Sequence, residues 1–241
     1  MITLPEAFEQ EMKQLLGEEE YEAYRKTFDE AVHRGLRVNN GKISTEEFLR
    51  RTDIPLKKVP WIPNGFYYDE ESCNPAKDAD YYAGLYYLQE PSAMTPASRL
   101  PIEPDDRVLD LCAAPGGKSM NVALKLTDGS VEARDLTPLK TQLIRENIAR
   151  LGLDNISVKE WDARVSDTAS KESADIVLAD LPCSGLGIIG RKPDIKYHTD
   201  IEKIEQLASL QREILTVVQE YVKPGGTLVY STVPSAGRKM K

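Results

Sequence analysis

The sequence predicts an α/β protein in which residues 101–241 form a doubly wound parallel sheet and residues 1–100 form a smaller α+β unit. From about residue 104 onwards, strand-like and helix-like segments alternate over short loops, which is typical of a parallel sheet with right-handed crossovers. The segment ADIVLA at 174–179 is apolar almost throughout, as expected of a strand covered on both faces. A length of 241 residues, 41% of them hydrophobic, is enough for one large core and a small subdomain.

The N-terminal part is expected to begin with helices. Apolar residues recur at helical spacing through residues 4–34, with an interruption at Gly17, and Gly35 is the expected C-cap of the second helix. Ser44 followed three residues later by Glu47 is a capping box that predicts a further short helix.

Strands and turns should follow. Residues 54–80 contain four prolines and many turn formers, so we expect short strands and loops there. The segment YYL at 86–88 is typical of a strand, and residues 92–100 are typical of a helix preceded by a proline.

The second half should supply the large sheet. One of its helices carries five apolar residues on one side, namely Leu139, Leu143, Ile144, Ile148 and Leu151. In chain order we expect a strand at 107–112, a helix at 119–126, a strand at 130–134, a helix at 137–151, strands at 156–159 and 174–179, a helix at 201–222 and, after a turn at 225–226, a strand at 227–232.

Polar residues stand at the ends of four expected strands, where sheets of this kind bind ligands. The first strand runs into Asp110-Leu-Cys-Ala-Ala-Pro-Gly-Gly-Lys, whose paired glycines allow close backbone approach and whose following helix N-terminus favours a carboxylate. The second ends in Asp135, where an acid can accept ribose hydroxyls. Asp162 follows the third, at the height of a bound base, and Asp180 ends the fourth.

Taken singly, each of these acids could be a helix cap or part of a surface loop, but four in order favour a nucleotide-type ligand. The glycine spacing matches neither a P-loop nor the GxGxxG fingerprint. A nucleotide-dependent dehydrogenase is therefore a weak alternative, since no His/Arg set for hydride transfer is evident either.

The composition restricts the function classes. A net charge of −8 is not the overall signature of a nucleic-acid binder, so any contact with a polyanion must use local basic patches. Three widely spaced cysteines and two histidines predict neither a disulfide framework nor a metal site. The sequence contains no apolar run of 18 residues, and its acidic start does not resemble a secretory signal, so we expect a cytoplasmic location.

Three segments, LDLCAAPGGKS, ADLPCSGLGIIGRKPDIKY and GGTLVYST, resemble the Sun/Fmu (Nop2-like) family of RNA cytosine-5 methyltransferases, which use S-adenosylmethionine. The resemblance covers essentially the whole chain. Its N-terminal part is similar to the branch with a small N-terminal RNA-binding subdomain, whereas residues 129–232 are more similar to another 16S branch, so the chain is either a mosaic or a divergent member. The resemblance implies a Rossmann-like class I methyltransferase acting on RNA, with 16S rRNA favoured and tRNA left open.

The resemblance also implies roles for individual residues. The loop of Cys112, Ala113, Ala114, Pro115, Gly116, Gly117 and Lys118 would surround the methionine part of S-adenosylmethionine. Asp135 would hold the ribose, Asp162 the adenine amino group, and Asp180 would lie beside both the cofactor and the flipped cytosine. Cys183 matches a cysteine that assists product release. The implied RNA contacts are Arg37, Asn39, Arg191 and Lys192.

One position departs from the family pattern. The attacking cysteine of the family follows Tyr-Ser-Thr, and here that position is Val233, which cannot add to a ring carbon. Either Cys183 serves as the nucleophile, or the protein is a catalytically impaired remnant that binds RNA or cofactor. The family's last strands are also expected to be missing, which would leave the strand carrying Tyr230 at the edge of the sheet and lower stability or promote self-association.

Overall fold

The computed structural model describes residues 4, 6–29, 34–183, 185 and 201–232. It divides into two compact units, which are interleaved along the chain. The first consists of Met1–Val32, Pro182–Arg212 and Thr232–Lys241, and the second of His33–Leu181 and Glu213–Ser231. Within the described ranges, no helix is both long enough and apolar enough to cross a membrane.

The first unit contains the two expected N-terminal helices, α1 (Glu6–Leu16) and α2 (Glu18–Lys26). They are separated by Gly17, whose φ of 81° lies in the left-handed region that glycine adopts readily. In α1, Met12 is buried but Leu15 is 56% exposed, so the apolar stripe predicted for this helix is only partly covered. The helix α9 (Ile201–Val218) also begins in this unit.

The second unit begins with a small antiparallel sheet in the order β2-β3-β1-β4. Its core contains Leu36, Val38, Phe48, Phe66 and Tyr86. The strands are β1 (Arg34–Val38), β2 (Lys57–Lys58), β3 (Gly65–Tyr68) and β4 (Tyr86–Leu88).

The expected helix C-cap at Gly35 is wrong, because this residue lies inside β1. A Cβ atom at Gly35 would come within 2.5 Å of the Gln89 carbonyl oxygen. Glycine is therefore needed here for close packing of two backbones and not for the end of a helix.

Short helices surround this sheet, and the sequence located most of them. In α3 (Thr45–Arg51), the Ser44 hydroxyl accepts a hydrogen bond from the Glu47 backbone N–H at 3.1 Å, which confirms the predicted N-cap. The helix expected at 92–100 is a 3-10 turn at Ser92–Met94 that continues as α5 (Thr95–Arg99). A further 3-10 turn at Pro75–Lys77 precedes α4 (Ala79–Tyr82).

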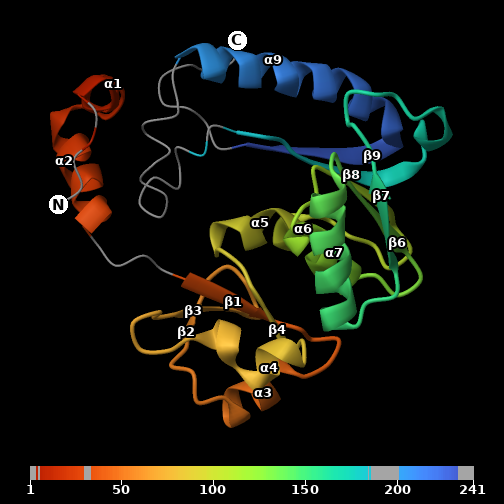
Figure 1. Ribbon diagram of the computed structural model, residues 1–241, viewed down its shortest axis with the longest axis horizontal. Helices are drawn as coiled ribbons and strands as arrows, with labels where there is room; N and C mark the ends of the chain where they lie inside the picture. Colours follow the sequence, from red (N-terminus) through yellow and green to blue (C-terminus); the bar gives the residue numbers. More distant parts are fainter. Residues whose placement is uncertain (1–3, 5, 30–33, 184, 186–200, 233–241) are drawn as a thin grey trace. The chain divides into compact units, whose positions relative to one another are not determined.

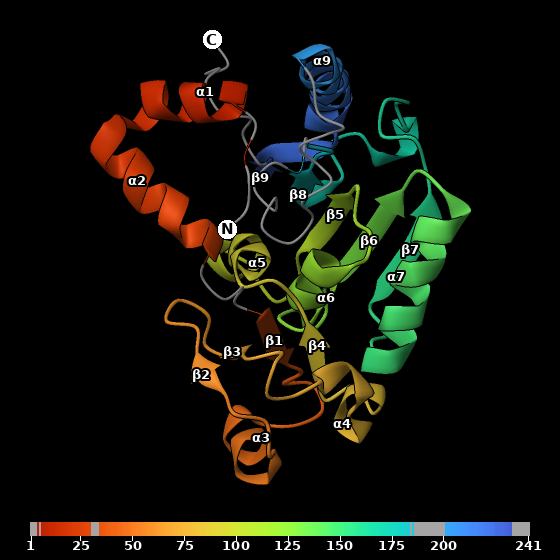
Figure 2. The same ribbon diagram turned by 60° about the vertical axis from the view of Figure 1, so that its left-hand side comes forward.

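The larger sheet has five parallel strands in the order β7-β6-β5-β8-β9, which confirms the predicted doubly wound fold (Figure 1; all five strands are labelled in Figure 2). Successive strands add outwards from β5 to β7, and the chain then returns to the other side of β5, so the topological switch point lies between β5 and β8. The strands are β5 (Arg107–Leu111), β6 (Ser130–Asp135), β7 (Ile156–Glu160), β8 (Ala174–Asp180) and β9 (Val222–Ser231).

Strand β9 is an edge strand among the described residues, as predicted for the strand that carries Tyr230. The turn expected at 225–226 is instead part of β9. Gly225 there has a φ of 84°, and the pairing with β8 shifts register between Ala174 and Ile176. An irregularity of this kind adds residues to one strand without ending the ladder.

Helices α6 (Gly117–Ala123) and α7 (Pro138–Leu151) follow β5 and β6, and α7 runs alongside β6 and β7 (Figure 2). Ile144 and Leu151 are buried, whereas Leu139 is 73% and Leu143 41% exposed. At about 100° per residue, Leu143 points about 100° and Leu139 about 140° away from Ile144, so the expected single apolar side of α7 is wrong at these two positions.

Candidate functional site

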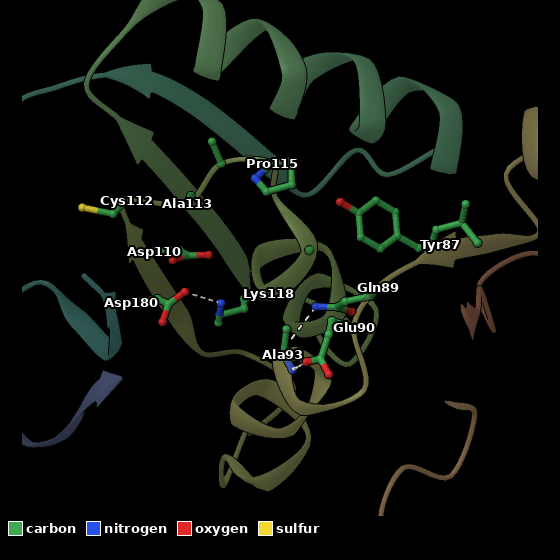
Figure 3. A pocket seen from close by; sticks show the side chains of 13 residues that line it. Tyr87, Gln89, Glu90, Ala93, Asp110, Cys112, Ala113, Pro115, Lys118 and Asp180 are labelled. Carbon is green, nitrogen blue, oxygen red and sulfur yellow. Dashed lines mark hydrogen bonds and ion pairs between the residues drawn. The ribbon is translucent and has the colours of Figure 1, made fainter. Parts of the chain in front are cut away.

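A pocket of about 230 Å³ opens at the switch point, where the carboxyl ends of β5 and β8 meet. One wall comes from the loop after β5 and from the start of α6, and includes Cys112, Ala113, Ala114, Pro115, Gly117 and Lys118. Asp110 and Asp180 lie on the strands themselves (Figure 3). The structure thus brings together six of the seven predicted loop residues with two of the four predicted strand-end acids, Asp110 and Asp180.

The loop between β5 and α6 is held by its own backbone and by Asp135. The Ala113 N–H donates to the Arg134 carbonyl at 3.0 Å, and the Gly116 N–H donates to the Ala113 carbonyl at 2.7 Å. Asp135, only 2% exposed, accepts from the Ala114 N–H at 2.9 Å and is paired with Lys140 at 3.0 Å. Asp135 therefore fixes the shape of the loop and does not itself line the pocket.

Lys118 and Asp180 form the charged centre of the pocket. The Lys118 ammonium donates to Asp180 Oδ2, and the two side chains point toward each other in Figure 3. The Ser231 hydroxyl donates to Asp180 Oδ1, so the end of β9 orients this carboxylate from its other side. The Asp180 side chain is still 37% exposed, which leaves it open to a ligand.

Asp110, one of the four predicted strand-end acids, lines the pocket, although no role of its own was predicted for it from the sequence. It is fully buried, its Oδ2 accepts from the Ser119 hydroxyl at 2.5 Å, and among the described residues nothing donates to its Oδ1. Burial raises the pKa of Asp110 to about 6, against the opposing effects of the Ser119 hydrogen bond and the Lys118 charge. The sequence did indicate a role for Asp110, because an acidic residue inside the otherwise apolar run VLDL is costly to bury unless it has a specific partner or ligand.

The opposite wall was also missed. It comes from the segment that follows β4, with Tyr87, Leu88, Gln89, Glu90 and Ala93 lining the pocket. Glu90 accepts from the Ala93 N–H at 3.1 Å, and Gln89 donates to the Ala93 carbonyl at 3.1 Å (Figure 3). The motif QEPSAM carries these residues, but nothing in its spacing alone assigns it to a pocket.

Asp162 lies apart from the pocket-lining residues. Arg164 donates to both of its carboxylate oxygens, at 2.6–3.1 Å, and this hydrogen bonding lowers the pKa of Asp162. Because Arg164 already donates to both oxygens of the Asp162 carboxylate, a ligand would have to displace Arg164 in order to bind it.

Arg37 and Asn39 are not accessible RNA contacts, which corrects the expectation from the sequence. They are 1% and 2% exposed: Arg37 lies on β1, an inner strand of the small sheet, and Asn39 directly follows that strand. Arg37 donates to Asn121 and to the Gly117 carbonyl, and Asn39 donates to the carbonyls of Gly84 and Leu151. The other two predicted RNA contacts, Arg191 and Lys192, lie outside the described residues.

Cys112 and Cys183 differ in how well each could act as a nucleophile. Burial, followed by the charge of Asp135, raises the pKa of Cys112 to about 12, so this side chain stays a neutral thiol at physiological pH. Cys183 is half-buried and follows β8 by three residues. Val233 lies outside the described residues.

These features define a Rossmann-like α/β protein with a polar ligand pocket at the topological switch point of its parallel sheet. A model of the 16S rRNA methyltransferase RsmB/F family matches residues 97–236, and a model of the N-terminal domain of 16S rRNA methyltransferase RsmF matches residues 4–91. The chain therefore belongs to the 16S rRNA methyltransferase RsmB/F family, which confirms the resemblance found in the sequence.

Individual relatives agree with this assignment. The chain is 33% identical to the ribosomal RNA small subunit methyltransferase F of Citrobacter koseri, over 96% of this chain and 50% of that protein. It thus spans about half the length of that relative. Among solved structures, it is similar to the protein PH0851 (TM-score 0.87, 27% identity, 94% of this chain and 52% of that one). It is also similar to a methyltransferase homolog protein from Pyrococcus horikoshii (TM-score 0.79, 31% identity, 92% and 70%).

Proposed function

We propose that this chain binds S-adenosylmethionine and methylates carbon 5 of a cytosine in RNA, with 16S rRNA as the substrate. The observation that carries the proposal is the pocket with Asp110, Lys118 and Asp180 at the switch point of the sheet, in a chain of this family. A cytoplasmic location goes with this proposal, since that is where a bacterial ribosomal substrate would be met.

The pocket residues fit S-adenosylmethionine. The cofactor carries an ammonium and a carboxylate on its methionine part, and Asp110 offers a buried carboxylate oxygen that has no donor among the described residues. A buried acceptor of this kind favours a cationic donor. The loop 112–118 and Asp180 would hold the methionine part, Asp135 the ribose and Asp162 the adenine.

Asp135 can serve both the loop and a ribose. A carboxylate has about four acceptor positions. Three are used in the structure, by the N–H groups of Ala114 and Leu136 and by Lys140. The remaining position on Oδ2 would accept a ribose hydroxyl.

The reaction needs a thiolate as well as a methyl donor, because carbon 5 of cytosine is a poor nucleophile. Bound S-adenosylmethionine would supply an electrophilic methyl group on its sulfonium. We propose that the Cys183 thiolate adds to carbon 6 of the flipped cytosine, which makes carbon 5 nucleophilic so that it can take the methyl group. A general base would then accept the proton of carbon 5, and the bond between carbon 6 and the Cys183 sulfur would break to release the thiolate. Asp180 would hydrogen-bond the edge of the base.

The second candidate function is an impaired protein that binds RNA and cofactor without turnover. Val233 favours it, because this residue stands where the family places its attacking cysteine. In that case Cys183 would keep only its role in product release.

Transfer of labelled methyl groups to 16S rRNA fragments, with tRNA as a second substrate, tests the proposal. We expect weak transfer to 16S rRNA, its loss in Cys183→Ala, and no change in the control Cys73→Ala. Cys73 does not line the pocket, and its thiol donates to the Asp69 carbonyl of its own loop. A gain in rate of about a hundredfold or more in Val233→Cys would locate a defect at that position. No transfer by either the wild type or Val233→Cys would contradict the proposed activity.

We further propose that residues 1–100 act as an RNA-binding subdomain and residues 101–241 as the methyltransferase domain. The two family models support a division near residue 100, since one ends at residue 91 and the other begins at residue 97.

A further inference from the structure

Arg37 is a buried cation that the proposed chemistry does not use. It lies on β1, 1% exposed, and donates to Gln89 Oε1 at 3.3 Å, Asn121 Oδ1 at 3.1 Å and the Gly117 carbonyl at 3.3 Å. All three acceptors are neutral groups, and among the described residues no carboxylate contacts Arg37. Burial lowers the pKa of Arg37 to about 10, so the guanidinium remains charged at neutral pH.

The acceptors of Arg37 belong to both walls of the pocket. Gly117 lines it on the α6 side and Gln89 on the side of the segment that follows β4. The Gln89 amide continues the network to the Ala93 carbonyl. One guanidinium therefore fixes both walls relative to each other, and it does so with the planar fork that only arginine offers.

The packing around this network leaves little freedom. A Cβ atom at Gly117 would lie 2.9 Å from Gln89 Nε2 and 3.1 Å from Tyr87 Cε1. On the other side, a Cβ atom at Gly35 would meet the Gln89 carbonyl oxygen at 2.5 Å. Gln89 thus packs closely against Gly35 of β1 and Gly117 of α6, and its side chain accepts a hydrogen bond from the guanidinium.

We propose that Arg37 is a positioning residue of the donor pocket: it sets the distance between the two walls, and its unpaired charge favours a ligand that carries a carboxylate. The inference rests on the proposed function, because the carboxylate would be that of the methionine part of S-adenosylmethionine. A buried charge without a counter-ion is costly. A carboxylate in the adjoining pocket would reduce that cost. The missing counter-ion of Arg37 would therefore also be what selects a ligand with a carboxylate.

A comparison of two ligands separates this role from a general contribution to stability. Decarboxylated S-adenosylmethionine keeps the sulfonium and the amine and lacks only the carboxylate. We expect the wild type to bind S-adenosylmethionine at least about tenfold more tightly than the decarboxylated form, and Arg37→Met to reduce this preference to within about threefold. Arg37→Lys should retain an intermediate preference, because it keeps the charge but loses the fork.

The matched control is Arg34→Met, on the same strand. Arg34 is paired with Glu70 at the surface, so its loss should leave the affinity for both ligands unchanged. If Arg37→Met does not fold, Gln89→Met replaces it, because this change removes an acceptor held by Arg37. It should reduce the preference to an intermediate value, since the charge of Arg37 remains.

Calorimetric titration of each variant gives the result. A wild type with no preference for the carboxylate, or an Arg37→Met variant that weakens both ligands by the same factor, would overturn the inference and leave the proposed function standing. A wild type that binds neither ligand would overturn both.

Discussion

At the scale of single residues, the site is a set of charges that differ in burial. Lys118 and Asp180 form an ion pair and are partly exposed, whereas Asp110 is fully buried and has one oxygen without a donor among the described residues. The consequence for Asp110 is energetic as well as functional. A carboxyl group whose pKa is raised in the folded state makes folding less favourable once it ionises.

Asp110→Asn should therefore stabilise the free protein in a pH-dependent manner. The pKa of Asp110 is raised from 3.8 to about 6, so the folded state binds this proton more tightly than the unfolded state does. The wild type then loses stability as the pH rises from about 4 to about 6, and the variant does not. The gain in unfolding free energy of the variant over the wild type should increase by about 2 kcal/mol between pH 4 and pH 7.

Urea unfolding at several pH values, followed by circular dichroism, measures this difference. Asp128→Asn, at an exposed turn, is the matched control and should change stability little at any pH. If the difference in unfolding free energy between Asp110→Asn and wild type stays constant with pH, or shrinks as the pH rises, the pKa of Asp110 is not raised in the folded protein.

The sequence was informative for residues at strand ends and poor for residues whose role depends on packing. Lys118 and Asp180 follow strands that could be recognised from their own apolar pattern, so their meeting was predictable. Arg37 and Asn39 were misassigned to RNA, because a polar residue on a short strand carries no sign that both faces of its sheet are covered. Only the partners in α6 and α7, some 80 to 112 residues away, decide that they are buried.

At the scale of elements, the small sheet is joined to α7 through the end of that helix. Lys42 donates to the Arg150 carbonyl at 3.0 Å, and Asn39 donates to the Leu151 carbonyl at 3.0 Å. Gly152 follows with a φ of 71° as the left-handed C-cap. These side chains satisfy carbonyls that the last turn of a helix leaves without a partner.

Asn39→Ala should destabilise the protein by about 2–3 kcal/mol, because it leaves the buried carbonyls of Gly84 and Leu151 without a donor. The neighbouring Asn40→Ala is the matched control. Asn40 is exposed, and its amide donates only to Ile43 and Thr45 in its own loop, so its loss should cost about 0.5 kcal/mol or less.

Chemical denaturation at neutral pH measures both variants. If Asn39→Ala and Asn40→Ala lose the same unfolding free energy, the hydrogen bond from Asn39 to the end of α7 contributes no more to stability than the local contacts of Asn40. An unchanged slope of the unfolding free energy against urea concentration would confirm that only stability, and not compactness, has changed.

Element types could be predicted better than element ends. The strands of the large sheet were located to within a few residues, because a strand buried on both faces is apolar along its length. Gly35 was predicted to end a helix and the glycine pair at 225–226 to form a turn, but all three lie inside strands. Glycine there permits a close approach of two backbones at Gly35 and a shift in strand register at 225–226. The sequence shows only that such a residue is glycine, not which of these reasons applies.

At the scale of the whole molecule, the pocket draws on residues from both sides of position 100. Residues 87–93 supply one wall, and residues 110–118 with Asp180 supply the other. The expected boundary between residues 1–100 and 101–241 therefore runs through the surroundings of the site. A fragment that begins at residue 101 would lack Gln89 and Arg37, and with them one wall of the pocket.

Because the two walls of the pocket come from separate parts of the chain, only one of them could be predicted from the sequence. The parallel sheet and its loop were predictable, because their signals are local and repeated along the chain. The second wall depends on the docking of an antiparallel sheet whose strands are only two to five residues long. No periodicity in such short strands indicates what they will pack against.

Calorimetric titration of the whole chain with S-adenosylmethionine tests the assignment of this pocket. We expect one site with micromolar affinity, corresponding to about −8 kcal/mol. Lys118→Met should weaken binding about tenfold, whereas Lys125→Met should not, since Lys125 follows the end of α6, does not line the pocket and donates to the Ala97 carbonyl. Absence of binding by the wild type up to millimolar S-adenosylmethionine would contradict the assignment of this pocket to the methyl donor.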